Sequence, residues 1–291
     1  MRILFIGGSG FVGRNVYDRL ILRHDVYLMS RHRPDWLPEE HNNWIEGNIT
    51  DLGSIKVALS KKFDVVVDFV GVMGQKEQTY QDVNVKGTSN LVEALEGRES
   101  IKLVYISAIN SERTSTEYLR TKMAAEKNIM QHRNYLIIRP SVFYGEGDYL
   151  TKQLLETARK YPPSFPKSGP MCPVYIKDFA EVFEALLAQT GVFNVCSNER
   201  LTLGAMLNIV RKRLKKPPIP EAPLLLFGAV SPILEAMGVI SAEQLMMLQY
   251  GFYREDTVLY KYVKKPVKYA EFVERYISPG RASSKQTASR P

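Results

Sequence analysis

The chain has 291 residues, 45% of them hydrophobic, and a formal net charge of +8. This composition excludes a disordered or fibrous chain and supports a large core in one or two domains. The two cysteines, Cys172 and Cys196, are too few for a disulfide framework, which fits a reducing compartment. The chain opens directly on a strand and has no apolar stretch of the roughly 20 residues that span a bilayer. We therefore expect a cytoplasmic protein without a signal peptide.

The first six residues form an apolar run that leads into Gly7, Gly10 and Gly13. This pattern predicts a buried strand, a tight turn and a helix start. Gly7 and Gly10 let the backbone approach a diphosphate, whose charge is stabilised at the helix N-terminus, and Gly13 lets the helix pack closely on the sheet. With Phe11 and Val12, these glycines form a candidate dinucleotide-binding turn. A purely structural turn is the alternative.

The second strand, at 26–30, indicates which dinucleotide is bound. An NAD site usually has Asp or Glu at its end, to hold the ribose hydroxyls. Here that position is Ser30, and Arg31 and Arg33 follow. A cation attracts a 2′-phosphate, by about 4 kcal/mol per close pair before screening, whereas a carboxylate would repel it. The sequence therefore favours NADP(H) over NAD(H), unless both arginines are merely solvated loop charges.

Strands and helices alternate through the rest of the first half, which predicts a parallel sheet covered on both faces. A third strand begins at 44 and runs into a turn with Asn48 and Ile49. A fourth, at 63–70, ends in small residues that would let a ribose or nicotinamide approach, and Val70, Gly71 and Val72 are candidate contacts there. We expect further strands at 102–107 and 135–138, and helices at 52–61, 82–94 and 147–160.

Several motifs resemble the extended short-chain dehydrogenase/reductase superfamily. Besides the glycine turn they are Asn84 with Gly87-Thr88, Tyr118-Leu-Arg-Thr-Lys122, Arg139-Pro140 through Tyr144-Gly145, and Pro173-Val-Tyr-Ile-Lys-Asp178. Segments 201–203, 217–223 and 241–248 are most similar to an atypical branch of it, which contains the dehydrogenase-like accessory subunit of respiratory complex I. The resemblance extends to about residue 277. It implies an α/β fold, a Rossmann doubly wound parallel sheet with a smaller, mostly helical C-terminal lobe.

The resemblance also implies roles for individual residues. Tyr118 would transfer a proton, and Lys122 would bind the nicotinamide ribose and lower the pKa of the tyrosine. Their spacing places both on one helix face, although such a pair alone is more often a surface pair. Asn84, Pro140 and Val142 would be further cofactor contacts. No metal site is expected.

One hydroxyl that orients the substrate carbonyl in many relatives is missing, because Ile109 stands at its position. Ser107 or Ser111 would have to replace it. Without such a donor the barrier rises by about 2.7–4 kcal/mol, so activity would be weak, specialised or absent.

We expect residues 1–145 to form the NADP(H)-binding domain, with 171–196 returning to its core. Residues 146–170 and 197–278 would form the C-terminal lobe, and 279–291 a flexible basic tail. Substrate would lie between the lobe and Tyr118, at the carboxyl ends of the strands.

Charge and apolar residues gather in the C-terminal half. Five of the six residues at 211–216 are cations, and basic residues accumulate again after Lys261. With the interrupted apolar stretch 223–250, these clusters fit an anionic membrane surface or a protein complex, and nothing indicates nucleic-acid binding. The alternative is a solvated helix end and an ordinary lobe core.

Two functions remain open on the sequence. The first is an NADP(H)-dependent oxidoreductase or epimerase-like enzyme that acts on a carbonyl or carbinol of an unidentified small molecule. The second is a non-catalytic accessory subunit of a membrane-associated assembly, in which the bound nucleotide stabilises the fold. Intact Tyr118 and Lys122 favour the first, and Ile109 with the apolar and basic C-terminal half favours the second.

Overall fold

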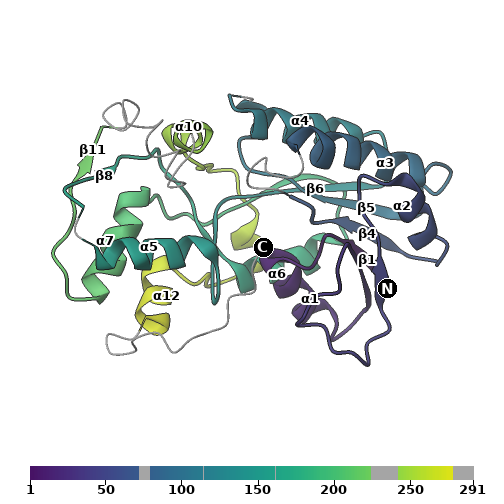
Figure 1. Ribbon diagram of the computed structural model, residues 1–291, viewed down its shortest axis with the longest axis horizontal. Coiled ribbons are helices and arrows are strands. Elements are labelled where there is room, and N and C mark those ends of the chain that lie inside the picture. Colours follow the sequence, from purple (N-terminus) through teal and green to yellow (C-terminus); the bar gives the residue numbers. More distant parts are fainter. Residues whose placement is uncertain (72–78, 114, 161, 224–241, 278–291) are drawn as a thin grey trace.

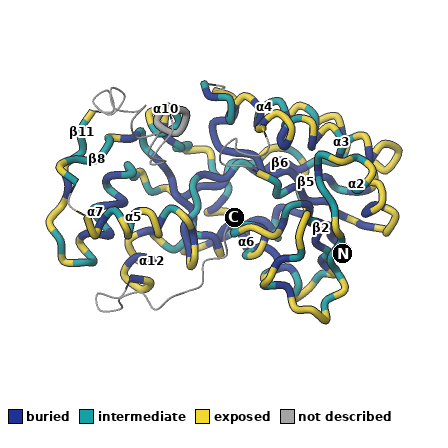
Figure 2. Tube along the Cα trace, in the orientation of Figure 1, coloured by how far each residue is buried: buried dark blue, intermediate teal, exposed yellow. Residues whose placement is uncertain are grey.

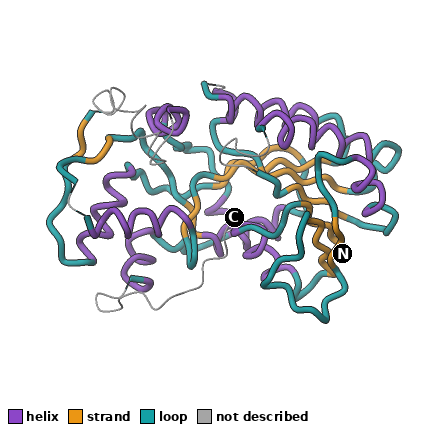
Figure 3. Tube along the Cα trace, in the orientation of Figure 1, coloured by secondary structure: helices purple, strands orange, loops and turns teal. Residues whose placement is uncertain are grey.

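The computed structural model describes residues 1–71, 79–113, 115–160, 162–223 and 242–277. Figure 1 shows a helix-covered sheet on one side and a smaller lobe on the other. Figure 3 shows the same division, with the long strands confined to the first part.

The sheet has seven strands in the order β10-β6-β5-β4-β1-β2-β3, and every neighbouring pair is parallel. Apolar residues that alternate along β1 bury Ile3 and Phe5 in one core and Leu4 and Ile6 in the other. A sheet buried on both faces therefore results, as the continuous apolar runs predict. The strands are β1 (Arg2–Ile6), β2 (Asp25–Ser30), β3 (Trp44–Glu46), β4 (Val65–Asp68), β5 (Lys102–Ile106), β6 (Tyr135–Pro140) and β10 (Gly191–Val195).

Helices cover both faces of this sheet (Figure 1). On one face α1 (Phe11–Leu20) packs against α6 (Ile176–Leu186), which also contacts α11 (Leu259–Tyr262). On the other face α3 (Gly87–Ala94) lies between α2 (Leu52–Ala58) and α4 (Glu117–Ile129). The helix expected at 82–94 differs from a plain α-helix, because a π-helical turn, Gln81–Lys86, leads into α3.

The lobe is mostly helical and has its own core. It contains α5 (Tyr149–Arg159), α7 (Leu203–Arg213), α10 (Ala242–Tyr250) and α12 (Tyr269–Tyr276), with β8 (Phe165–Pro166) paired to β11 (Glu221–Ala222). A further short pair, β7 (Phe143–Tyr144) with β9 (Val174–Tyr175), lies where the chain leaves the sheet. The rings of Tyr144, Tyr269 and Phe272 pack together in this core, and Figure 2 shows buried chain continuing from the sheet into the lobe.

The predicted doubly wound parallel sheet with a helical lobe is confirmed. Residues 224–241 of the interrupted apolar stretch, and the tail at 279–291, lie outside the described residues. No helix in the described part of the chain is both long enough and apolar enough to cross a membrane. Cys172 and Cys196 are both free and buried.

The basic run at 211–216 is partly internal. The Arg211 side chain is buried and donates hydrogen bonds to the carbonyls of Pro217, Ala158 and Lys160. Arg213 donates to the Ile277 carbonyl and pairs with Glu274, and Lys216 donates to the Arg159 carbonyl. These three cations therefore hold the end of α7 against α5 and α12.

Candidate active site

The glycine turn between β1 and α1 has the geometry that a bound diphosphate needs. Gly7 has a φ of +72°, and a Cβ there would lie 2.3 Å from Cγ2 of Val70. A Cβ on Gly13 would lie 2.4 Å from the Gly8 carbonyl oxygen, whereas Gly10 faces open space. The first turn of α1 has neither a side-chain cap nor an acidic residue. Its free N–H groups can therefore bind an anion.

The end of β2 carries a hydroxyl and an exposed cation. Ser30 Oγ donates to the His32 carbonyl (2.7 Å) and accepts from Trp44 Nε1 (3.0 Å), while Arg31 is exposed. Arg33, unlike Arg31, is only partly exposed, and its guanidinium binds the loop that follows. Its Nη2 donates to three backbone carbonyls, those of Pro38 (2.7 Å), Glu39 (3.3 Å) and His41 (2.9 Å).

A second exposed cation, Arg14, lies on the first turns of α1 and was not singled out from the sequence. Its guanidinium carbon is 5.6 Å from the centre of the Trp36 ring. Trp36 in turn donates from Nε1 to the carbonyl of Ser9 in the glycine turn (3.1 Å). The loop after β2 is thereby fixed beside the glycine turn.

Asn48 and Ile49 have local structural contacts in the turn after β3. The Asn48 side chain accepts a hydrogen bond from the Thr50 amide (3.1 Å). Ile49 is buried against Gly87, where a Cβ would lie 3.0 Å from Ile49 Cγ1. Gly87 therefore lets α3 approach this turn closely.

Asn84 lies in the π-helical turn and faces α4. Its Nδ2 donates to Thr121 Oγ1 (3.1 Å), and its buried Oδ1 has no hydrogen-bond partner among the described atoms. A buried acceptor of this kind fits a donor from a bound molecule or water. Val72, the neighbouring candidate after β4, lies outside the described residues.

Lys122 lies beside the end of β4. Its side chain is buried, and Nζ donates to the Ile106 carbonyl (3.0 Å) and lies 4.7 Å from the centre of the Tyr105 ring. A Cβ on Gly71 would lie 3.8 Å from the same Nζ. Burial lowers the pKa of Lys122 to about 8, against the opposing effect of Asp68 and Glu126.

Tyr118 lies one turn earlier on α4, whose start is capped by Thr116, the acceptor for the Leu119 amide (3.3 Å). The Tyr118 ring is half-buried and meets the Tyr80 ring edge-on at 5.7 Å. Burial raises the pKa of Tyr118 to about 12. In this arrangement the phenol keeps its proton at neutral pH. The lowering that the resemblance implies, by Lys122 together with a bound oxidised nicotinamide, stays a prediction.

Ser107 and Ser111 both donate hydrogen bonds to a buried carboxylate, Glu126. Ser107 donates to Glu126 Oε1, and Ser111 donates to the same oxygen at 2.8 Å. Arg139 completes the cluster with bonds from Nε (2.9 Å) and Nη2 (2.5 Å). Since each hydroxyl has one proton, neither serine donates elsewhere in this arrangement. Ile109, at the expected hydroxyl position, is fully buried in the core.

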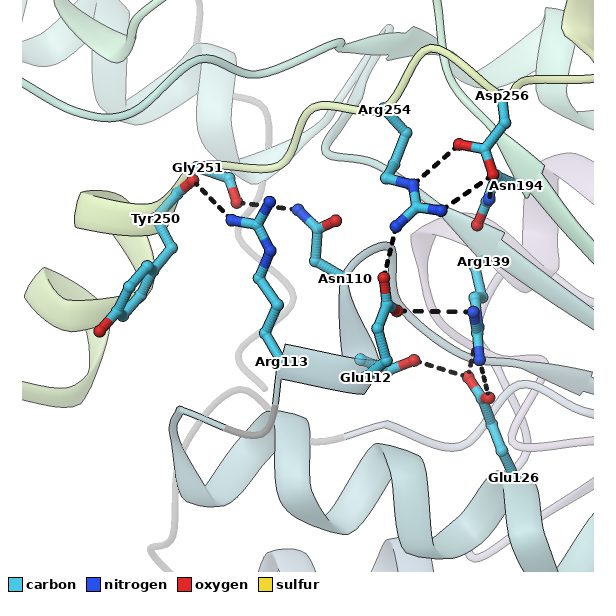
Figure 4. Close-up of polar contacts among 11 residues, drawn as sticks. Asn110, Glu112, Arg113, Glu126, Arg139, Asn194, Tyr250, Gly251, Arg254 and Asp256 are labelled. Carbon is cyan, nitrogen blue, oxygen red and sulfur yellow. Dashed lines mark hydrogen bonds and ion pairs between the residues drawn. The ribbon is translucent and has the colours of Figure 1, made fainter.

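A chain of charges links this cluster to the segment after α10 (Figure 4). Glu112 pairs with Arg139 (3.5 Å) and with Arg254 (2.5 Å), and Arg254 pairs with Asp256 (2.8 Å). Asn110, which has a positive φ of 62°, donates to the Gly251 carbonyl at 3.4 Å. The loop after β5 is thus attached to residues 250–256.

Pro140 and Val142 lie where β6 leaves the sheet. The Pro140 carbonyl accepts from the Ile109 amide (3.0 Å), which fixes the loop after β5. The Val142 carbonyl accepts from the Val174 amide (2.9 Å), and the Val142 side chain packs on the core of the lobe. Val142 therefore belongs to the boundary between sheet and lobe.

Besides Arg14, three polar groups of this site were not predicted from the sequence: Asp68, Glu126 and Tyr105. Asp68 interrupts an apolar run, which is a signal that reading for strands passes over. Glu126 lies four residues after Lys122, on the same helix face as the pair already singled out. Tyr105, in the middle of an apolar strand, reads as core, yet its buried hydroxyl has no partner among the described atoms.

A protein-family model described as the NAD dependent epimerase/dehydratase family matches residues 3–196, more than half of the chain. The chain belongs to this family. The matched region includes the glycine turn, Tyr118 and Lys122, and it confirms the resemblance to extended short-chain dehydrogenases/reductases. The narrower likeness to the complex I branch stays a prediction.

The curated relatives include dehydrogenases and a 4-epimerase. A 3-beta-hydroxysteroid dehydrogenase of Mycolicibacterium neoaurum is 30% identical over 179 residues, which are 50% of this chain and 49% of that protein. The chain spans about half the length of the curated relatives that it matches.

Solved structures share the fold over nearly the whole chain. The triphenylmethane reductase of Citrobacter sp., complexed with NADP(H), has a TM-score of 0.75 at 15% identity, covering 95% of this chain and 100% of that one. The Bordetella bronchiseptica enzyme WbmG, in complex with NAD, has a TM-score of 0.74 at 17% identity, covering 94% and 91%. The fold thus occurs with either dinucleotide.

Proposed function

We propose that the chain is an NADP(H)-dependent oxidoreductase or epimerase-like enzyme that acts on a carbonyl or carbinol through Tyr118 and Lys122. One observation carries this proposal: the segment after β4 contacts both the glycine turn and Lys122. Gly7 packs on Val70, and the next residue, Gly71, lies against Lys122 Nζ. A dinucleotide with its diphosphate at Gly10 would therefore have its nicotinamide ribose near Lys122.

The residues present fit such a cofactor. The uncapped start of α1 would hold the diphosphate, and the Lys122 ammonium would donate to the ribose hydroxyls. When bound, a nicotinamide cofactor supplies or accepts a hydride. Tyr118 would then supply the proton, because its phenol is protonated at neutral pH and can donate to a carbonyl oxygen as hydride arrives at the carbon.

The preference for NADP(H) is supported by charge at the adenosine end. Ser30 takes the place of the usual carboxylate at the end of β2. Arg31, the next residue, is exposed, and so is Arg14 on α1. Arg33 contributes less than expected, because its guanidinium is held by loop carbonyls. At exposed positions the attraction to a 2′-phosphate is screened by salt, so the preference should fall as ionic strength rises.

Two substrate classes fit the proposed function. The hydroxysteroid dehydrogenase among the relatives supports an apolar carbinol or ketone, and a 4-epimerase among them, named for a glucosaminyl-diphospho-undecaprenol, supports a sugar diphosphate. Either would enter between Tyr118 and the lobe.

A second candidate is the non-catalytic accessory subunit. The observation that favours it is the commitment of the Ser107 and Ser111 protons to Glu126, with Ile109 buried in the core. A carbonyl placed at Tyr118 would then receive a hydrogen bond from neither serine.

Calorimetric titration with NADPH and NADH tests the proposal. We expect NADPH to bind at least tenfold more tightly, and Arg31→Ala to remove most of that difference. Arg133→Ala, which removes an exposed cation after α4, is the matched control and should leave the ratio unchanged. Equal affinities of the unaltered chain for both dinucleotides would contradict the preference.

Turnover is measured separately, as NADPH oxidation with steroid ketones and nucleotide-linked 4-keto sugars. Oxidation that depends on Tyr118 supports the enzyme. Tight NADPH binding with no oxidation across both substrate classes supports the accessory subunit.

A further inference from the structure

Asp68 is a buried carboxylate at the carboxyl end of β4, with only 1% of its surface exposed. In the sheet it lies directly opposite Tyr105 on β5, so the two side chains stand next to each other on the face that α4 covers. Its Oδ1 accepts a hydrogen bond from the Val70 amide (2.8 Å). One amide does not offset the cost of burying a full negative charge, so the carboxylate needs a nearby cation or a proton.

The buried ammonium of Lys122 requires a nearby negative charge. Its ammonium is buried above the Tyr105 ring, and its bond to the Ile106 carbonyl brings no negative charge. Two buried carboxylates lie within its electrostatic reach, Asp68 and Glu126. Glu126 is already neutralised by the two bonds from Arg139. Among the described residues, Asp68 is thus the carboxylate available to balance Lys122.

We propose that Asp68 is the positioning residue for Lys122: its carboxylate balances the charge of the ammonium, which stays protonated above the Tyr105 ring beside Gly71. The role rests on the proposed function, because holding Lys122 there serves to bind the nicotinamide ribose. Asp68 itself touches neither substrate nor reacting atoms in this arrangement.

Other titratable groups face the same space. They are Tyr105 from β5, Tyr118 and Glu126 from α4, and Tyr80, which packs on Tyr118. Burial raises the pKa of Tyr105 and of Tyr118, so both phenols are neutral near pH 7. Burial also raises the pKa of Asp68 to about 7 and lowers that of Lys122 to about 8, so both members of this pair change charge near neutrality.

The effect of Asp68 on the charge of Lys122 depends on pH. Below pH 7 Asp68 is protonated, so Asp68→Asn changes little there. Above pH 7 the unaltered chain has a carboxylate that favours the charged form of Lys122, and Asp68→Asn removes it. The variant should therefore lose the ammonium at a lower pH.

The first experiment titrates Lys122 itself and needs no cofactor. Lysines labelled with ¹³C at Cε are followed by NMR from pH 6 to 11, and Lys122→Met assigns the signal. We expect Asp68→Asn to move the midpoint down by about one pH unit or more. Asp64→Asn is the matched control, because Asp64 is exposed before the amino end of β4 and bonds the Arg2 amide. An unmoved midpoint in Asp68→Asn overturns the proposal.

The second experiment measures NADPH affinity over the same pH range. Asp68→Asn should bind roughly tenfold more weakly than the unaltered chain at pH 8 and about equally at pH 6, while Asp64→Asn follows the unaltered chain throughout. Superimposable profiles for Asp68→Asn and the unaltered chain overturn the role in binding. A shifted Lys122 midpoint in a chain that binds no NADPH would instead support the charge pair and contradict the proposed function.

A double variant serves as the control for loss of folding. If Asp68→Asn alone does not fold, the cause should be the unbalanced ammonium, so Asp68→Asn/Lys122→Met should fold. Failure of the double variant to recover would overturn the proposal.

Discussion

Replacing Glu126 by Gln should destabilise the folded chain more than any comparable change of an exposed carboxylate. The Glu126 side chain is fully buried and accepts four hydrogen bonds, two of them from Arg139. Gln preserves the shape and one oxygen, but it removes the charge and turns an amide group toward the guanidinium. Among the described residues, Glu112 at 3.5 Å would then be the carboxylate still paired with Arg139.

Removal of one partner from a buried ion pair typically costs about 3–5 kcal/mol, because the other charge stays buried and uncompensated. The Arg139 side chain is 15% exposed, so water relieves part of this cost, and we expect about 3 kcal/mol. At about 2–4 °C per kcal/mol for large domains, the melting temperature should fall by roughly 10 °C.

Differential scanning calorimetry at pH 7 measures this fall, with Glu112→Gln as the matched control. Glu112 is 37% exposed in its side chain and forms the same kinds of pairs at the surface. Such pairs contribute at most about 1 kcal/mol, so the control should lose less than about 4 °C. Equal losses in the two variants would refute the argument that burial makes the Glu126 pair costly to break.

The paired variant Glu126→Leu/Arg139→Met refines the test. Replacing a whole buried ion pair by apolar residues is often neutral, so this chain should be more stable than Glu126→Gln alone. If it is less stable, the serine hydrogen bonds rather than the charge pair carry the stability.

The remaining predictions concern catalysis and pH. Tyr118→Phe should leave NADPH affinity nearly unchanged and abolish any turnover, whereas Lys122→Ala should also weaken binding; normal turnover by Tyr118→Phe would remove the tyrosine from its assigned role. Burial raises the pKa of Asp178 to about 6, and its carboxylate accepts from the Val267 amide (2.8 Å). Because the folded chain then holds a proton that the unfolded chain releases, this group lowers stability as pH rises from about 4 to 6. Asp178→Asn should therefore raise the melting temperature at pH 7.5 and not at pH 4, which thermal scans at both pH values would show.

The sequence predicts those helices, strands and turns that short sequence patterns determine. The spacing of Gly7, Gly10 and Gly13 predicts the turn between β1 and α1, because Gly13 avoids a steric contact within this βα unit, Gly7 avoids one with Val70 after the adjacent strand, and Gly10 leaves open space. The apolar run at 63–70 likewise predicts a central strand, observed as Val65–Asp68. These patterns depend on contacts within one βα unit or with an adjacent strand.

The polar partners depend on contacts that join distant residues. Glu112 meets Arg254 from 142 positions away, and Glu126 selects Arg139 through the packing of α4 on β6. Arg211 shows the same limit in a charged run: it reads as a surface cation, yet the fold buries it among the carbonyls of Ala158 and Pro217. The sequence shows how many charged side chains a segment has, but not which of them the fold buries.

The hydrogen bonds between residues 250–257 and the sheet limit where a chimera with a related protein can be joined. The family match ends at residue 196, yet Phe252 bonds the Pro170 carbonyl and the Cys172 amide, and its carbonyl also accepts from Ser141. A fragment cut at 196 would remove the carbonyls of Phe252 and Arg254 that accept from the two thiols, and would leave Glu112 without Arg254. A chimera that exchanges only a part of the lobe between residues 197 and 249 should therefore retain residues 250–257 with their own sheet.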